Sequence, residues 1–217
     1  MIKALRKNLL RICLHLLSLI PATWLGWQVW LWVNFAAHDL TANPIEYITD
    51  FTGGWTIRFL LITLSISPLS RLTKWSLLKY RRLFGLYAFL YGLLHFLNYM
   101  VLDYYFDWPL IIEDIFKRPA ISFGMMAFCL LIPLAVTSFK FVIKKMAKSW
   151  QTLHQLIYLL TIFAVIHNYM MVKADVLVPI IHGIILSFLL GYRIITRWNK
   201  QKSIFKKQLA WNNILQK

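Results

Sequence analysis

Acidic residues and cysteines are scarce in this chain. Its 217 residues include eight aspartates and glutamates, against 24 lysines and arginines, and only two cysteines. Cys13 and Cys129 make neither a disulfide framework nor a metal-binding motif, so we expect them to be buried packing residues. The chain also has no glycine-rich phosphate loop of the G-x-G-x-x-G type, which argues against a nicotinamide-binding domain.

Charged residues of either sign are few, and apolar residues predominate. Charged residues make up 15% of the chain and hydrophobic residues 59%, whereas a soluble domain has about 25% charged residues. A helix of about 20 apolar residues spans a bilayer core of ~30 Å, and lipid tolerates only helices or closed barrels. The sequence therefore predicts an all-α integral membrane protein, a single domain over residues 1–217 with six transmembrane helices. The six apolar windows are about 12–33, 52–70, 83–101, 119–138, 152–172 and 176–196.

The charges between these windows alternate in sign. Basic residues predominate at the start of the chain, in 71–82, in 140–148 and in the tail, while 34–51 and 102–118 are acidic. Because cytoplasmic loops carry the excess of lysine and arginine, both termini are predicted to be cytoplasmic and both acidic loops periplasmic. Nucleic-acid binding would instead need the basic residues on one soluble face.

Five of the six histidines lie in or at the ends of predicted spans, where ionisable side chains are costly and usually functional. His95 in the third span and His167 in the fifth both lie about 20 Å from the cytoplasmic end of their helix, at 1.5 Å per residue. Two imidazoles from different helices at one level can hold a haem iron from both sides, as in other bundle cores. With no C-x-x-C-H sequence, the haem would be of the non-covalent b type. With both axial positions filled, it would transfer electrons rather than bind gas.

His154 marks the inner end of the fifth span. A second haem there would need a ligand on the third span where the chain has Arg81, and a guanidinium cannot ligate iron. His15, near the inner end of the first span, is a replacement candidate. The inner site is therefore a second haem, an exchange of ligands or a quinone-binding histidine.

Three arginines and one further histidine are weaker candidates. Arg81 and Arg82 could hold propionates of an inner haem or polarise a quinone oxygen, or they are ordinary cytoplasmic basic residues. Arg58 in the second span either pairs with a haem propionate or reaches the outer head groups. His182 in the sixth span is expected to be a packing histidine with satisfied hydrogen bonds; the alternatives are a spare haem ligand and a hydrogen-bond donor to one of the ligands.

Several short stretches resemble the MsrQ (YedZ) family of ferric-reductase-like transmembrane domains, over nearly the whole chain. They are "CLHLLSLIP" at 13–21, "FTG" at 51–53, "SPLSR" at 67–71, "RRLFGL" at 81–86, "LHFLNY" at 94–99, "KRPAISFG" at 117–124, "AVTS" at 135–138, "WQTLHQLIYL" at 150–159 and "IHNYMMVK" at 166–173. The resemblance implies that His95, His154 and His167 are haem ligands. It also implies a membrane subunit of the bacterial inner membrane that carries electrons but is not the catalytic subunit. In that family electrons pass from the quinone pool to a periplasmic molybdopterin subunit that reduces methionine sulfoxide, and FMN is a further candidate cofactor.

Two other functions remain open from the residues alone. A stand-alone ferric or oxygen reductase would need an exposed outer haem edge and activity without a partner. A non-redox transporter would use the histidines as a proton relay, but the predicted spans contain no paired acidic residues and no internal repeat.

Overall fold

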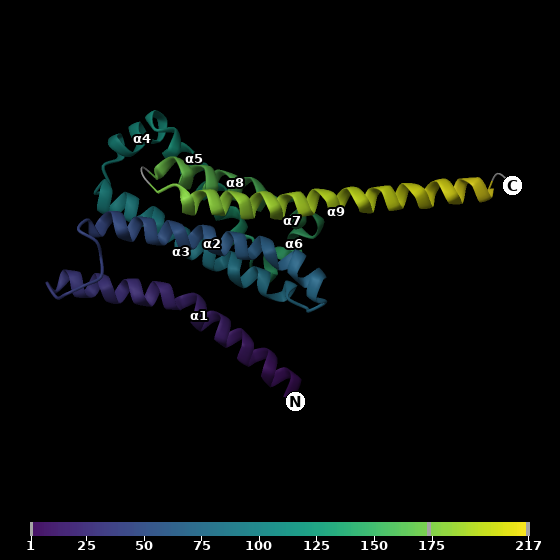
Figure 1. The fold of residues 1–217 in the computed structure, drawn as a ribbon, viewed down its shortest axis with the longest axis horizontal. Coiled ribbons are helices and arrows are strands. Elements are labelled where there is room, and N and C mark those ends of the chain that lie inside the picture. The colour runs from purple at the N-terminus through teal and green to yellow at the C-terminus, as the bar shows by residue number, and fades with distance from the viewer. Residues whose placement is uncertain (1, 173–174, 216–217) are drawn as a thin grey trace.

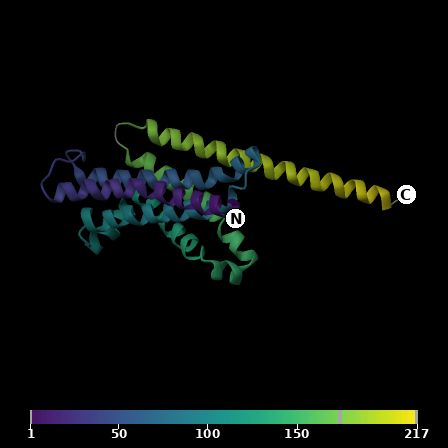
Figure 2. The same cartoon turned by 90° about the horizontal axis from the view of Figure 1, so that it is seen from below.

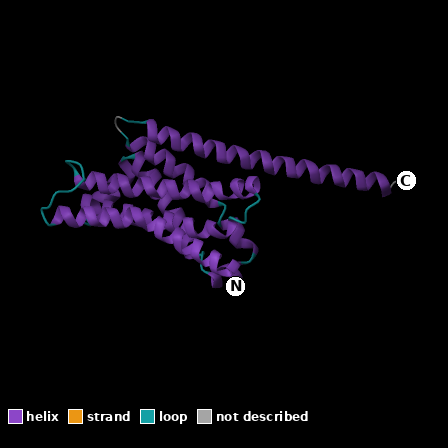
Figure 3. Cartoon of the chain, turned by 60° about the horizontal axis from the view of Figure 1, so that its bottom comes forward, coloured by secondary structure: helices purple, strands orange, loops and turns teal. Residues whose placement is uncertain are grey.

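The computed structural model describes the backbone of residues 2–172 and 175–215, and the side chains of residues 8–172, 175–205 and 208. This part of the chain is helical with short connections (Figure 3). The α-helices are α1 (Ile2–Val33), α2 (Pro44–Thr73), α3 (Arg81–Asn98), α4 (Trp108–Lys117), α5 (Pro119–Val136), α6 (Lys140–Met146), α7 (Lys148–Leu153), α8 (Leu156–Met171) and α9 (Leu177–Leu215). A 3-10 turn, Leu78–Tyr80, precedes α3, and a π-helical segment, Tyr99–Asp103, follows it.

Five helical segments are long and apolar enough to cross a membrane, so the chain is a multi-pass membrane protein. They are Asn8–Val33, Leu78–Asp103, Pro119–Val136, Lys148–Met171 and Leu177–Phe205, and each contains one predicted span or most of it. The remaining predicted span, 52–70, lies within α2, which has 30 residues but is less apolar because it contains Arg58, Gly53 and Gly54 and several hydroxyl residues. Six crossings and the orientation of the termini therefore stay predictions.

α2 lies at the centre of the bundle, where it packs against α3, α8 and α9 (Figures 1 and 2). Its buried residues Leu60 and Leu64 belong to the main apolar core, together with Tyr91 of α3 and Leu160 of α8. The segment 102–118, predicted only as a loop, contains α4, which Asp107 caps by accepting a hydrogen bond from the backbone N–H of Leu110. Such N-caps satisfy a backbone donor that the helix itself leaves free.

The cysteines are not buried, and that prediction was wrong. Cys13 on α1 and Cys129 on α5 are both exposed on the surface of the chain. The side chains near Cys13 on α1, for example Ile12 and Leu16, are also apolar and exposed. A thiol behaves as a small hydrophobic group, so the apolar pattern of a membrane helix does not distinguish its packed face from its lipid face.

α1 bends near its middle, where Pro21 interrupts the helix (Figure 1). The hydroxyl of the fully buried Tyr91 lies in the gap: it donates to the Ser18 carbonyl and accepts from the Ala22 N–H, both at 2.9 Å. A side chain that enters the hydrogen-bond ladder is a recognised cause of helix bending. Tyr91 therefore both satisfies the backbone of α1 and attaches it to α3.

A second proline has a different partner. Pro68 in α2 has no N–H to donate to the carbonyl four residues before it, that of Leu64. The guanidinium of Arg193 on α9 donates to this carbonyl at 2.8 Å, and it also hydrogen-bonds the Tyr158 hydroxyl and lies over the Tyr158 ring. Such side-chain bonds are how membrane helices tolerate proline, and this one joins α2, α8 and α9.

α9 extends well beyond the bundle (Figures 1 and 2). Its 39 residues correspond to a length of about 58 Å, roughly twice the hydrocarbon thickness. Lys173 in the predicted fifth loop lies outside the described residues, as do the side chains of residues 1–7, 206–207 and 209–217, on which the predicted charge pattern partly depends.

Candidate functional site

Two histidines from separate helices face each other in the bundle. His95 on α3 and His167 on α8 have ring centroids 6.0 Å apart, with ring planes inclined at 72°. They are 72 residues apart in the sequence, and their depths along the third and fifth spans place them at one level. The structure brings together the pair that the sequence singled out.

The His95 ring lies against α2. Its Nδ1 is 2.9 Å from the Thr49 carbonyl oxygen, and one turn further along α2 a Cβ on Gly53 would lie 3.0 Å from the ring. The carbonyl orients the imidazole, and the missing Cβ of the glycine makes room for it.

The His167 ring lies against α5 in the same way. Its Nδ1 is 2.7 Å from the Ala120 carbonyl oxygen, and four residues further on a Cβ on Gly124 would lie only 2.8 Å from the ring. Each histidine thus has a carbonyl acceptor and a glycine four residues later on the neighbouring helix. This repeated arrangement lets two bulky rings lie beside helix backbones without displacing them.

The hydrogen bonds at Nδ1 decide which nitrogen is free. A carbonyl oxygen accepts only, so Nδ1 is the donor at both histidines, and Nε2 of the neutral ring keeps its lone pair. Metal-bound histidines characteristically donate their other N–H to a carbonyl or carboxylate in this way. Both side chains are therefore in the tautomer that a metal ligand at Nε2 requires.

The spacing of the rings fits an iron held between them. With a metal–nitrogen bond of about 2 Å on each side and a ring radius of about 1 Å, two axial imidazoles have centroids about 6 Å apart. Among the described residues, no group of three or more His, Cys, Asp and Glu side chains gathers as a metal cluster. Two imidazoles suit a metal whose remaining ligands come with a macrocycle, so this site fits a haem.

His154 lies in a break between helices. α7 ends at Leu153 and α8 begins at Leu156, so the predicted helix from 152 to 172 is interrupted at its inner end. His154 stacks on Trp150 at 4.0 Å between ring centroids, and its Nε2 is 3.1 Å from the Thr137 hydroxyl. The angle of about 140° that an ideal helix would set between His154 and His167 therefore does not apply, and Nε2 would have to leave Thr137 to bind a metal.

The other inner candidates lie near the start of α3 or against it. Nδ1 of His15 is 2.9 Å from the Tyr87 hydroxyl, so its partner is a packing residue of α3. Arg81 is the first residue of α3, and Arg82 beside it is exposed.

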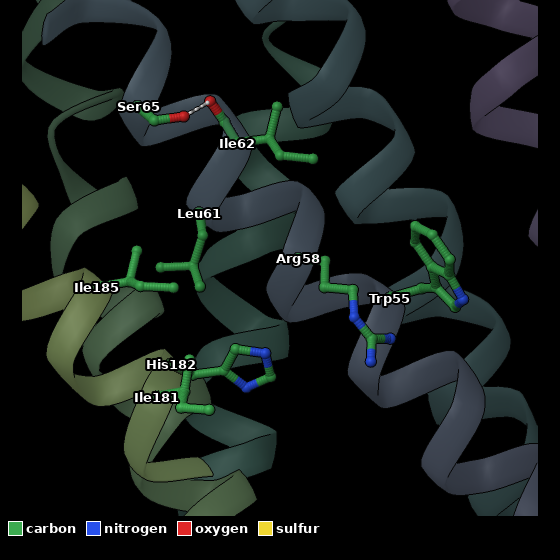
Figure 4. Close-up of a pocket in the computed structure, with 8 residues that line it drawn as sticks. All are labelled: Trp55, Arg58, Leu61, Ile62, Ser65, Ile181, His182 and Ile185. Carbon is green, nitrogen blue, oxygen red and sulfur yellow. Dashed lines mark hydrogen bonds between the residues drawn. The ribbon is translucent and has the colours of Figure 1, made fainter. Parts of the chain in front are cut away.

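Arg58 and His182 line a pocket of about 380 Å³ between α2 and α9 (Figure 4). The exposed Arg58 guanidinium lies over the Trp55 ring, 5.1 Å from its centroid. His182 is 7% exposed, and its buried Nδ1 has no hydrogen-bond partner in the described part of the chain. The expectation of a satisfied packing histidine was therefore wrong.

Sequence reasoning missed Thr49, Gly53, Ala120 and Gly124. Two of the stretches noted above contained the signal, because "FTG" ends at Gly53 and "KRPAISFG" ends at Gly124. A glycine in a helix interior costs stability and so indicates a close approach, but only the structure shows that a histidine approaches.

A helical membrane bundle that pairs two imidazoles from different helices defines a class of redox membrane proteins. In agreement, residues 52–165 match the family model described as "Ferric reductase like transmembrane component", a segment that ends two residues before His167.

Three relatives carry the name "Protein-methionine-sulfoxide reductase heme-binding subunit MsrQ". The one from Xanthomonas oryzae pv. oryzae is 41% identical over 86% of this chain and 84% of its own, and that from Xanthomonas campestris pv. campestris is 39% identical over 89% of each. The relative from Azospira oryzae is 42% identical over 87% of this chain and 79% of its own. The chain belongs to the MsrQ family of ferric-reductase-like membrane proteins.

Proposed function

We propose that this protein is the haem-binding membrane subunit of a methionine-sulfoxide reductase system in a bacterial inner membrane. It would take electrons from the quinone pool and deliver them to a periplasmic molybdopterin subunit that repairs oxidised proteins. The observation that supports this most directly is the pairing of His95 with His167 at 6.0 Å, each with Nδ1 bound to a backbone carbonyl. The names of the relatives point the same way.

In this proposal His95 and His167 hold a b-type haem through Nε2. The haem supplies one-electron chemistry, and the chain supplies its position and surroundings. The carbonyls of Thr49 and Ala120 hold the ring orientations and raise the basicity of the ligands. The apolar core beside the site lowers the local dielectric and tunes the potential.

For the inner end of the bundle, the alternative functions that the sequence left open remain part of the proposal. His154 would ligate a second haem, exchange with another ligand or bind quinone, with His15 as a further ligand candidate. Arg81 and Arg82 would hold propionates, a quinone oxygen or the phosphate of FMN. The hydrogen bond from His154 to Thr137 and that from His15 to Tyr87 would compete with each of these roles.

Electrons would leave on the periplasmic side, where the acidic segments 34–51 and 102–118 would meet a basic patch on the partner. Several of these carboxylates already have partners in the chain: Asp114 with Arg118, Glu113 with Lys117, and Asp39 with Gln28. The cations reduce the outward field of Asp114 and Glu113, whereas the neutral Gln28 leaves the charge of Asp39 in place. Docking would therefore depend on the carboxylates without a cationic partner and weaken in high salt.

Absorption and electron paramagnetic resonance spectra of the purified protein test the haem, and rapid mixing tests the direction of flow. Quinol should reduce the haem, and the periplasmic subunit with methionine sulfoxide should reoxidise it. A protein without haem would favour the transporter with a histidine proton relay. Reoxidation by ferric iron or oxygen alone, at a rate that the partner does not increase, would favour the stand-alone reductase.

A further inference from the structure

We infer that the pocket between α2 and α9 binds the ring of a quinone or quinol, with Arg58 and His182 as the polar contacts. The inference rests on the proposed function only in taking a quinol as the electron donor. It places the quinone-binding site in the predicted outer half of the bundle instead of at the inner end.

The shape of the pocket favours a molecule with one polar end and an apolar tail. Trp55, Arg58, Ile62 and Ser65 form one stripe along α2, about 15 Å long at 1.5 Å per residue. Ile181, His182 and Ile185 of α9 face this stripe (Figure 4). Arg58 and His182 lie towards the same end, whereas the rest of the lining is largely aliphatic. At about 380 Å³ the pocket is near the lower limit for small-ligand sites, enough for one substituted ring.

The hydrogen-bonding state of the polar groups favours a ligand with oxygens. The buried His182 Nδ1 has no partner within the described residues, and Arg58 makes no hydrogen bond or ion pair among them. A buried polar group without a partner costs free energy. Because Nδ1 itself is buried, a ligand would bond it after a turn of the imidazole ring, whereas the exposed Arg58 guanidinium is open to a ligand as it stands. A neutral imidazole can donate to a quinone carbonyl or accept from a quinol hydroxyl.

The other candidate region is less available. Of the inner histidines, His15 is bound to Tyr87 and His154 to Thr137. A ligand there would have to replace bonds that already exist, whereas at His182 it would add one.

Photolabelling of the haem-loaded protein tests the inference without any electron transfer. The probe is a short-chain ubiquinone carrying an aryl azide, with unlabelled short-chain ubiquinone as competitor and mass spectrometry to locate the label. Label is expected on residues 55–65 and 181–185. Arg58→Met and His182→Leu should each weaken competition about fivefold, as expected for one lost hydrogen bond. Arg197→Met, at an exposed arginine outside the pocket, is the matched control and should change nothing, while Ser65→Phe, which fills the pocket, should abolish labelling.

Each remaining outcome has a definite meaning. Label on residues 15, 81–82 or 154, or a loss of labelling in Arg197→Met, would overturn the inference. If Arg58→Met or His182→Leu lowered the haem content but left labelling unchanged, these two side chains would serve a haem propionate, and their assignment as the polar contacts of the quinone would be overturned. Labelling in the pocket together with a haem that quinol never reduces would uphold the binding site and refute the quinol-donor function.

Discussion

Gly124 lies so close to His167 that a Cβ at this position would be 2.8 Å from the imidazole. The ring cannot move away freely, because its Nδ1 is bound to the Ala120 carbonyl one turn earlier on the same helix. Gly53 stands in the same relation to His95 through Thr49. The positions of the two proposed haem ligands thus depend on two glycines of neighbouring helices.

Gly124→Ala should displace the His167 ring and break its hydrogen bond to Ala120. Overpacking of this kind costs about 1–3 kcal/mol, which corresponds to roughly 5- to 150-fold weaker haem retention. Haem content per protein, measured as the pyridine haemochrome, would show it. Gly191→Ala is the control, since a Cβ there meets nothing within 4 Å, and equal haem content in both variants would contradict the role given to Gly124.

His95→Ala and His167→Ala should each lose most of the low-spin bis-histidine signal, because each removes one axial ligand. His154→Ala should keep that signal if a single haem lies between His95 and His167. Low-temperature electron paramagnetic resonance of the oxidised protein measures it. A variant at His95 or His167 that retains the full signal would remove the ligand assignment.

Arg193→Met should destabilise the bundle, because it leaves the Leu64 carbonyl without a donor. An unsatisfied buried group costs about 1–3 kcal/mol. The penalty should shrink in a Pro68→Ala background, where the new N–H at residue 68 can donate to the Leu64 carbonyl. Thermal unfolding of the four proteins in detergent gives the coupling. The exposed Arg197 provides a control as Arg197→Met, and purely additive effects at 68 and 193 would contradict the explanation.

Alkaline phosphatase, which is active only in the periplasm, should be active when fused within 34–51 or 102–118 and inactive after Lys217. The physical reason is the excess of lysine and arginine predicted on the cytoplasmic side. A fluorescent protein that folds only in the cytoplasm provides the reciprocal measurement at Lys217. Phosphatase activity at the C-terminus would invert the topology and with it the proposed direction of electron flow.

Depth along a helix was predictable from sequence because rise per residue is constant, and it sufficed to pair His95 with His167. Exposure within the membrane was not predictable, as Cys13 and Cys129 show, since lipid and protein core are both apolar. The break at His154 was also hidden, because the apolar run reads as a continuous helix through that point.

The hydrogen-bond partners of the backbone groups near the prolines could not be predicted from the sequence either. From the sequence alone, Arg193 is the first basic residue of the predicted cytoplasmic tail. The basic residues that follow it in the tail favour that interpretation. The contact of Arg193 with the Leu64 carbonyl joins residues 129 positions apart, and no local pattern encodes such a pairing. The same holds for the carbonyls of Thr49 and Ala120, which every residue type could supply.

The hydroxyl of Tyr91 in the α1 ladder has a consequence for biosynthesis. Ala22 leaves the ribosome 69 residues ahead of Tyr91, a delay of roughly 3 to 14 seconds at ordinary translation rates. During that interval the Ser18 carbonyl and the Ala22 N–H can bond each other as in an uninterrupted α-helix, and the Tyr91 hydroxyl replaces this bond once α3 packs against α1. α1 can therefore reach its final bent form only after α3 has been made, and the first helix to enter the membrane is among those completed late.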